Sequence, residues 1–312
     1  MEGEVTIQGW GRQGVQGREI FSEDLDALTR DVPLSRGLGR SYGDASLPPP
    51  SRAIVANTTL ANRILAFDAA TGTLTAEAGL SLMDLNAVMT PKGFFPPVTP
   101  GTQFVTLGGM VASDVHGKNH HVSGTFGRHV DAIRLRVASG EILTCSRTEH
   151  PELFFATLGG MGLTGHVLDV TFRMEAIPSP WIYQETERLP NIDAIIEGLQ
   201  SAAKDWPMTM AWMDSLVQGD AMGRGILYRG RWATPDEAPQ GIPRRPLRIP
   251  IPFDFPNFLL NPLTMRFRSS IMAWVPGRMG TSRAMEMPGR GKERRPSPSG
   301  PQSFTTTRKL IP

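Results

Sequence analysis

The sequence predicts an α+β fold, because segments with strand periodicity alternate with segments of helical periodicity. Apolar and polar residues alternate over 130–138 and over 166–174, as in half-buried strands. Helical spacing covers 81–89 and 191–199, and each of these segments begins at a serine or asparagine that can cap a helix. With 312 residues, the chain can bury a core in one large domain or two smaller ones.

The charge is close to balanced overall but unevenly placed. The formal net charge is +2, whereas residues 277–312 alone carry eight Lys or Arg against two Glu. The remaining residues are therefore slightly acidic, which argues against a nucleic-acid partner for the folded part. A nucleic-acid binder acting through the basic tail remains an alternative, with salt-sensitive affinity as its mark.

Cysteine content and hydropathy limit the class of protein further. Cys145 is the only cysteine, so neither an internal disulfide nor a cysteine-based zinc site can form, and we expect a buried small apolar residue there. The acidic N-terminus lacks the apolar core of a secretory signal. No run approaches the roughly 18–20 apolar residues of a membrane helix, so we expect a cytoplasmic protein without an integral membrane segment.

The first hundred residues are expected to contain short elements. After an irregular N-terminal segment, Ser22 is predicted to cap a short helix that ends near Pro33. A strand is expected at 53–56, and a hairpin at 64–78 around Gly72. The helix at 81–89 should stop at the following proline and glycine.

The later part of the chain predicts a second folded unit, followed by a segment whose composition is typical of disorder. A strand at 142–145 and a helix at 152–157 complete the first unit, which we place at 1–177 with an internal break near 98–100. Proline and serine at 177–180 predict a boundary, and 178–267 reads as a partial second α+β domain with strands at 208–214 and 225–232. Residues 268–312 are expected to be disordered, as a basic interaction tail or as the result of a shifted reading frame.

Three glycine clusters are the candidate functional segments. The first, 36–44, lacks the G-x-G-x-x-G spacing and has no long helix after it, which argues against a Rossmann site. A tight turn between strands is one interpretation. The other is a diphosphate loop, which two arginines, Ser41 and Tyr42 would suit. Together with the central cluster at 100–121 and a third at 159–165, it indicates a large, flat cofactor that bears phosphate.

Histidines gather in the central cluster. His116, His120, His121 and His129 are four of the six in the chain. A metal site that also used Asp114 is one alternative, although a single short segment rarely presents all its ligands in tetrahedral geometry. We therefore assign no metal site. For His116, which we expect to follow a strand of small residues, a hydrogen bond to a cofactor ring is the favoured role.

The three clusters in this order resemble the flavoproteins of the vanillyl-alcohol-oxidase type, which have a PCMH-type FAD-binding domain of two α+β subdomains. The segment 37–44 is similar to the diphosphate loop of that family, and 100–109 with His116-Gly117 is similar to its central FAD segment. The cluster 159–165 is similar to its adenine-side turn. Within the family, the runs 114–121 and 123–127 resemble the oxidases of decaprenylphosphoryl-ribose. The resemblance covers about residues 8–260.

The resemblance implies which residues bind FAD. His116 and Lys118 are the expected flavin-side catalytic residues. The expected cofactor-binding residues are Arg36, Gly37, Leu38, Gly39, Arg40, Ser41, Tyr42, Gly43, Asp44, Gly101, Thr102, Thr106, Leu107, Gly108, Gly109, Ser113, His116, Gly117, Lys118, Asn119, Gly162 and Val167. Relatives that bind FAD covalently carry a histidine where this chain has Arg40, so noncovalent FAD is expected.

The implied reaction is FAD-dependent oxidation of a secondary alcohol on a sugar. The expected substrate is the 2′-hydroxyl of decaprenylphosphoryl-ribose, in the first half of an epimerisation to the arabinose form that a short-chain reductase partner completes. Such a lipid-linked substrate would also place the protein at a membrane surface. The alternatives are a polyol or aldonolactone oxidase and a truncated flavin-binding protein without catalysis. The family continues with a flavin-side lysine and a pocket cysteine, and nothing after Arg268 matches that segment, so no general base is identified.

Overall fold

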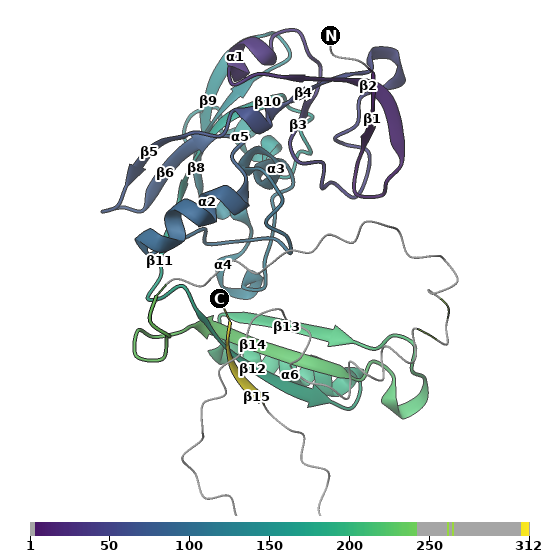
Figure 1. Cartoon of the computed structure of the whole chain (residues 1–312), viewed down its shortest axis with the longest axis vertical. Helices are drawn as coiled ribbons and strands as arrows, with labels where there is room; N and C mark the ends of the chain where they lie inside the picture. Colours follow the sequence, from purple (N-terminus) through teal and green to yellow (C-terminus); the bar gives the residue numbers. More distant parts are fainter. Residues whose placement is uncertain (1–3, 242–260, 262–263, 265–306, 312) are drawn as a thin grey trace, which may run out of the picture. The chain divides into compact units, whose positions relative to one another are not determined.

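The structure is a computed structural model that describes residues 4–241, Asn261, Thr264 and 307–311. It divides into two compact units, Met1–Ile177 and Pro178–Pro312 (Figure 1). Helices and strands are mixed in both units, so the predicted α+β class is confirmed.

A four-stranded sheet opens the first unit. Its strands follow the order β1 (Val5–Gln8), β2 (Gly14–Phe21), β4 (Ile54–Asn57) and β3 (Ser35–Arg36). β1 and β2 are antiparallel, whereas β2 and β3 both run parallel to β4. The expectation of an irregular N-terminal segment was wrong. In β2 only Gly17 is buried and two glycines interrupt the run, so the apolar alternation that marks a strand is nearly absent from its sequence.

A five-stranded antiparallel sheet forms the rest of the first unit. Its order is β5 (Ile64–Asp68), β6 (Thr73–Glu77), β10 (His166–Arg173), β8 (Val130–Arg136) and β9 (Ile142–Ser146). The predicted hairpin and the later strands are confirmed. Because β5 and β6 already belong to this sheet, the two sheets divide between Asn57 and Ile64, and the expected break near 98–100 does not coincide with that division.

Short helices and turns connect these strands. The α-helices are α1 (Leu25–Leu28), α2 (Leu82–Met89), α3 (Leu107–Ala112), α4 (His120–Ser123) and α5 (Pro151–Thr157). The 3₁₀ helices are η1 (Pro50–Arg52), η2 (Thr58–Leu60), η3 (Thr90–Lys92), η4 (Phe126–His129) and, in the second unit, η5 (Gly219–Ala221). β7 (Phe94–Phe95) and β11 (Glu175–Ala176) form a two-stranded ribbon.

Side-chain caps fix where the helices begin. Ser81 Oγ accepts a hydrogen bond from Asp84 N at 3.1 Å, as predicted for α2. For α1 the predicted cap was wrong, because Asp24 accepts from Ala27 N at 3.0 Å. Ser22 Oγ instead accepts a hydrogen bond from Asp24 N, next to the helix cap.

The core of the first unit lies between the five-stranded sheet and the apolar faces of α2 and α3. Leu85 and Met110 are fully buried there, and the rings of Phe126 and Phe172 meet edge to face with centroids 5.1 Å apart. Each such side chain contributes roughly 1.5–3 kcal/mol by leaving water. Cys145 is buried in the same cluster, as expected.

The second unit is a sheet with one long helix against it. The strand order is β13 (Met208–Met213), β14 (Gly225–Trp232), β12 (Ile182–Leu189) and β15 (Thr307–Ile311), all antiparallel. The helix α6 (Ile192–Asp205) begins at Asn191, whose side chain accepts from Ala194 N at 3.0 Å, and buries Ile195 and Ala202 (Figure 1). Among the described residues, no helix is both long and apolar enough to cross a membrane.

The strand β15 corrects the expectation that residues 268–312 lack regular structure. Its backbone pairs with β12 from Ile182↔Ile311 to Thr186↔Thr307. A strand added to an existing sheet needs no core of its own, so five residues can be ordered in a segment whose composition predicts disorder. Residues 268–306 and Pro312 lie outside the described residues.

Candidate cofactor site

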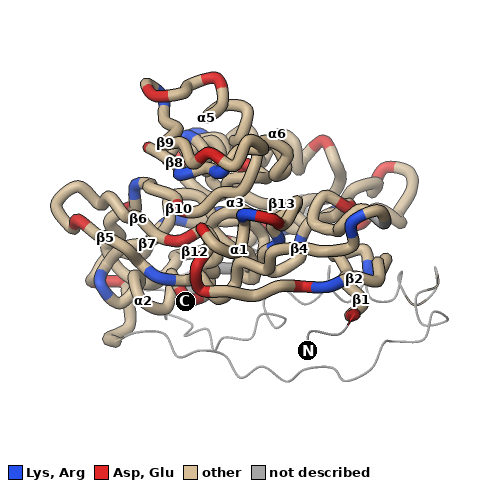
Figure 2. The backbone as a smooth tube through the Cα atoms, turned by 90° about the horizontal axis from the view of Figure 1, so that it is seen from above, with Lys and Arg blue, Asp and Glu red and all other residues tan. Residues whose placement is uncertain are grey.

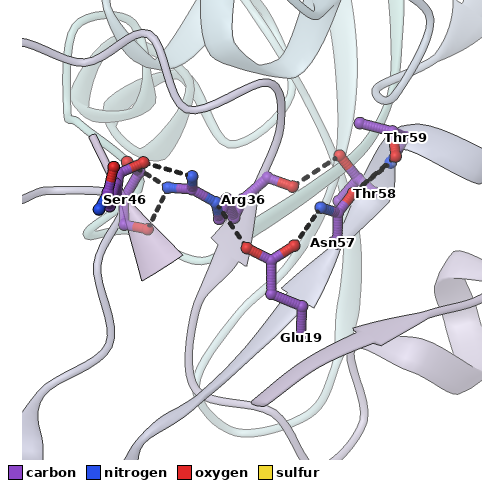
Figure 3. Close-up of polar contacts among 7 residues, drawn as sticks. Glu19, Arg36, Ser46, Asn57, Thr58 and Thr59 are labelled. Atoms are coloured by element: carbon purple, nitrogen blue, oxygen red, sulfur yellow. Dashed lines mark hydrogen bonds and ion pairs between the residues drawn. The ribbon is translucent and has the colours of Figure 1, made fainter. Parts of the chain in front are cut away.

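Arg36 ties the first glycine cluster to the sheet beneath it. Its side chain is buried, and Nε lies 3.1 Å from Glu19 Oε1. Nη2 donates to Gln8 O at 2.5 Å, and Nη1 donates to Ser46 O and Oγ at 3.2 Å each (Figure 3). The guanidinium predicted to bind phosphate is therefore engaged within the protein, where it joins Ser46, near the end of its loop, to β1 and β2.

Glu19 extends this network across the four-stranded sheet. Its Oε2 accepts from Asn57 Nδ2 at 2.7 Å, and the Asn57 side chain in turn accepts from Thr59 N at 3.1 Å. Thr58 Oγ1 donates to Arg36 O at 3.3 Å, so β2, β3 and the end of β4 are joined at one point (Figure 3). We did not predict Glu19 or Asn57, because only the parallel pairing of these strands brings them to Arg36.

The loop after Arg36 packs closely on both sides. Gly39 has φ +63°, and a β-carbon there would overlap with the Arg36 guanidinium. A β-carbon at Gly37 would overlap with Thr106 Oγ1, at the start of α3. Glycine is needed at both positions, and the first cluster is thereby set directly against the central one.

The middle of the central cluster, before His116, is the helix α3 and not the strand of small residues that we expected. Thr106 Oγ1 caps α3 by accepting from Gly109 N at 3.3 Å. The amides of Leu107 and Gly108 donate to Leu80 O at 3.0 Å and Ala78 O at 2.8 Å, so they are already paired within the protein. Leu107 is buried, whereas Gly109 and Ser113, four residues apart on one face, are exposed.

The segment from His116 to Asn119 is fixed by its neighbours and exposes two cationic or ionisable side chains. A β-carbon at Gly117 would lie 2.6 Å from Thr99 O, and Asn119 Nδ2 donates to Pro97 O at 2.7 Å. These contacts hold the segment against Pro97 and Thr99, which come shortly before Gly101 in the chain. His116 and Lys118 remain exposed, and the His116 ring lies 5.6 Å from that of His120.

The third cluster is joined to the other end of α3. Gly159 N donates to Val111 O at 3.1 Å, and Met161 N donates to Ala112 O at 2.8 Å. The chain then enters β10, where Val167 is buried. The first and third clusters thus contact opposite ends of α3, which belongs to the central cluster, although all three lie far apart in the sequence.

Other predicted residues of the first and central clusters are linked through side chains and backbone. The Arg40 guanidinium lies over the Phe104 ring at 5.6 Å from its centroid. Ser41 O accepts from Trp10 N at 3.1 Å, and Thr102 Oγ1 accepts from Phe104 N at 3.2 Å. Arg40 and Asp44 are both exposed, so their side chains can reach a ligand.

Each cluster also leaves open space beside one glycine. Among the described residues, no atom lies within 4 Å of a β-carbon placed at Gly43, Gly101 or Gly162. Large apolar side chains are exposed in these segments, with Tyr42 at 86% and Leu163 at 92%. A bare backbone beside exposed apolar groups fits a flat ring system that would cover them, so the residues present suit a flavin dinucleotide.

A separate cavity of about 460 Å³ lies near α1, where Figure 2 shows acidic residues along the tube. Its carboxylates include Glu77, which pairs with Arg63, and Asp169, which lies 2.5 Å from Arg134 Nε. Burial raises the pKa of Asp169, and the bond to Arg134 opposes that rise. In the described part of the chain, no three His, Cys, Asp or Glu side chains are grouped as metal ligands.

Comparison with known proteins identifies the class of this unit. Residues 27–146 match the family model described as "FAD binding domain". The match spans β3, α3 and the His116 segment, and over these residues it bears out the predicted resemblance to PCMH-type flavoproteins.

Among curated proteins, the chain is 33% identical to decaprenylphosphoryl-beta-D-ribose oxidase of Mycolicibacterium smegmatis, over 83% of this chain and 60% of that protein. It is 25% identical to D-arabinono-1,4-lactone oxidase of Yarrowia lipolytica, over 75% of this chain and 44% of that protein. Similarity to L-gulonolactone oxidase of Scyliorhinus torazame is 36% over 36% of this chain and 25% of that protein. The chain therefore spans 60% or less of the length of these relatives.

Proposed function

We propose that the chain binds FAD noncovalently at the surface that the three glycine clusters form around α3. The observation that carries this proposal is that α3 exposes Gly109 and Ser113, while the first and third clusters contact its two ends. The family match over 27–146 supports FAD as the cofactor.

Residues of this chain would divide the work of holding the cofactor. We assign the diphosphate to the loop after Gly37, with the exposed Arg40 and the half-buried Ser41 beside it, and the adenine side to Gly162 and Val167. Arg36 contributes its backbone only, because its guanidinium is engaged with Glu19. Arg40 offers no nucleophile for a covalent bond to the flavin, which supports noncovalent binding.

We further propose that the protein oxidises a secondary alcohol on a sugar, with the 2′-hydroxyl of decaprenylphosphoryl-ribose as substrate. The named Mycolicibacterium relative supports this substrate class. When bound, the flavin supplies the acceptor for the hydride that leaves the substrate carbon. The exposed His116 and Lys118 can present N–H groups and positive charge beside that carbon or the ring.

A lipid-linked substrate would place the site of action at a membrane surface, and its keto product would need a short-chain reductase to reduce it. Both belong to this proposal. The second candidate is an aldonolactone or polyol oxidase, which the Yarrowia and Scyliorhinus relatives favour.

Substrate trials on the flavin-loaded full chain separate these candidates. The chain would be mixed under anaerobic conditions with a short-chain polyprenyl-phosphate ribose, an aldonolactone or a polyol, while flavin absorbance near 450 nm is followed. We expect bleaching by the first substrate alone. Bleaching by the lactone or polyol would favour the second candidate, and a bound flavin that no substrate bleaches would indicate a flavin-binding protein without catalysis.

A further inference from the structure

His166 and Ser35 connect the two sheets of the first unit at the edge of the proposed cofactor surface. His166 begins β10 in the five-stranded sheet, whereas Ser35 begins β3 in the four-stranded sheet. Their side chains meet, with His166 Nδ1 2.7 Å from Ser35 Oγ. Although 131 residues separate them in the sequence, this bond joins the strand that leads into the first glycine cluster to the strand that follows the third.

Both ends of this bond sit beside residues that we assign to the cofactor. Ser35 is followed by Arg36 and Gly37, and Gly37 packs against Thr106 with no space for a β-carbon. His166 lies between Gly165, which crosses closely over Arg136 O, and Val167. A change in the distance between Ser35 and His166 would therefore alter the separation of the two cofactor-binding segments.

The environment of His166 suits a neutral hydrogen-bonding group. Only 9% of the residue is exposed, and burial lowers the pKa of its imidazole, with Arg136 adding to that effect and a hydrogen bond to the Val32 backbone opposing it. The Arg136 guanidinium is itself held by Thr29 Oγ1 at 3.0 Å and by Asp26 O at 2.8 Å. The hydroxyl of Ser35 can donate or accept, so it matches either tautomer of the neutral ring.

We propose that His166 and Ser35 form a brace that positions the first and third glycine clusters for FAD. Each is a positioning residue, because it acts on the cofactor through its neighbours and not by contact. This inference rests on the proposed FAD site and adds to it residues outside the predicted set. It explains how two loops carried by separate sheets can offer a single preformed surface.

The test compares FAD affinity of full-length variants with that of a matched control. Ser35→Ala and His166→Phe remove the bond, whereas His166→Asn keeps a polar atom near the position of Nδ1. Thr171→Val is the control. Thr171 lies on β10, as His166 does, but away from the glycine clusters, and the change removes a part-buried hydrogen bond of 2.9 Å between the hydroxyls of Thr171 and Thr75. FAD affinity is measured by quenching of flavin fluorescence, and stability by thermal unfolding of the FAD-free protein.

We expect Ser35→Ala and His166→Phe to raise the Kd for FAD by roughly three- to tenfold, since one hydrogen bond contributes about 0.5–1.5 kcal/mol. His166→Asn should recover most of the affinity, and Thr171→Val should leave it unchanged. Amide exchange in 37–46 of the FAD-free protein should quicken in the first two variants only.

Two results would overturn the inference alone. One is a Kd for FAD in Ser35→Ala and His166→Phe that equals the Kd of the wild type. The other is a loss of affinity in Thr171→Val as large as the loss in those two variants. A wild-type chain that binds no FAD would instead contradict the proposed function, and the brace with it.

Discussion

At the scale of single residues, the Glu19–Arg36 pair fixes the first glycine loop to the strands beneath it. The two side chains are 10% and 17% exposed, so both charges are largely removed from water. Such a pair adds little net stability compared with apolar residues of the same size, but removing one partner leaves the other charge buried. Gln8 O and Ser46 would lose their donors at the same time.

Arg36→Met should therefore lower the free energy of unfolding by about 3 kcal/mol, since it leaves the Glu19 carboxylate unpaired in the interior. The control is Arg173→Met, which breaks a 3.1 Å contact with Asp131 between side chains that are 69% and 36% exposed. That change should cost less than about 1 kcal/mol. Urea unfolding of the three proteins measures both effects, and equal losses in the two variants would argue against the Arg36 hub.

The sequence could not separate a phosphate-binding Arg36 from a structural one. An arginine in a glycine loop suits both roles, and the difference lies in Glu19, Gln8 and Ser46, which reach it through strand pairing and loop closure. Periodicity predicts which residues form a strand, but it does not tell which strand lies beside it.

At the scale of elements, α3 offers the exposed face to which we assign the cofactor. Its buried face packs into the core through Leu107, Met110 and Val111, while Gly109 and Ser113 leave the opposite face without bulk. Glycine is a poor helix former, so the composition of 107–112 hides the helix. One feature of the sequence could have indicated this helix: Thr106, a preferred N-cap residue, stands just before the apolar run.

Ser113→Leu should abolish FAD binding without unfolding the protein. Leucine at this exposed position would fill the space that we assign to the cofactor, and it sits at the end of α3 without entering the core. Gln200→Leu, at an exposed position of α6 in the second unit, is the matched control. FAD titration and circular dichroism are the measurements. A Ser113→Leu protein that binds FAD as the wild type does would exclude the α3 face as the site.

Elements with strong periodicity were predictable, and weakly patterned ones were not. The helices α2, α5 and α6 and the strands of the five-stranded sheet agree with the sequence, because buried residues recur along one face. β12 was missed because residues 184–188 are five consecutive polar residues, so the strand shows no apolar alternation, and only Thr186 in it is buried. β15 was missed because its order depends on a partner more than a hundred residues away.

At the scale of the whole molecule, stability below neutral pH should reflect His166. The imidazole is buried and its pKa is lowered from the ordinary value of 6.5, so the unfolded chain takes up the proton first. Stability is therefore fully present above about pH 6.5 and falls as pH drops toward the folded-state pKa. The groups that face the ring are the Arg136 guanidinium, Ser35 Oγ and the Val32 backbone.

Urea unfolding between pH 8 and pH 5 tests this expectation. The wild type should lose stability as the pH falls, and His166→Phe should lose less, so that the two curves converge at low pH. The Glu237 carboxyl, whose pKa Arg231 lowers to about 2, gives up its contribution at lower pH and does so equally in both proteins. Parallel curves for wild type and variant would show that His166 does not titrate on unfolding.

The proposed FAD site draws on segments between Gln8 and Val167. The glycine clusters predicted a large, flat cofactor that bears phosphate, and the family resemblance that they carry predicted FAD. The contacts that bring the clusters together, from Gly37 against Thr106 to Met161 against Ala112, could not be predicted. They depend on the relative placement of two sheets, which no local pattern encodes.

Binding of FAD to the purified full chain tests the central claim most directly. The FAD-free protein would be titrated with FAD, and the loaded protein would then be precipitated with acid. We predict saturation near one FAD per chain, followed by release of intact FAD into the supernatant. Failure to saturate would contradict the assigned cofactor site, and flavin that remains with the precipitated chain would contradict noncovalent binding.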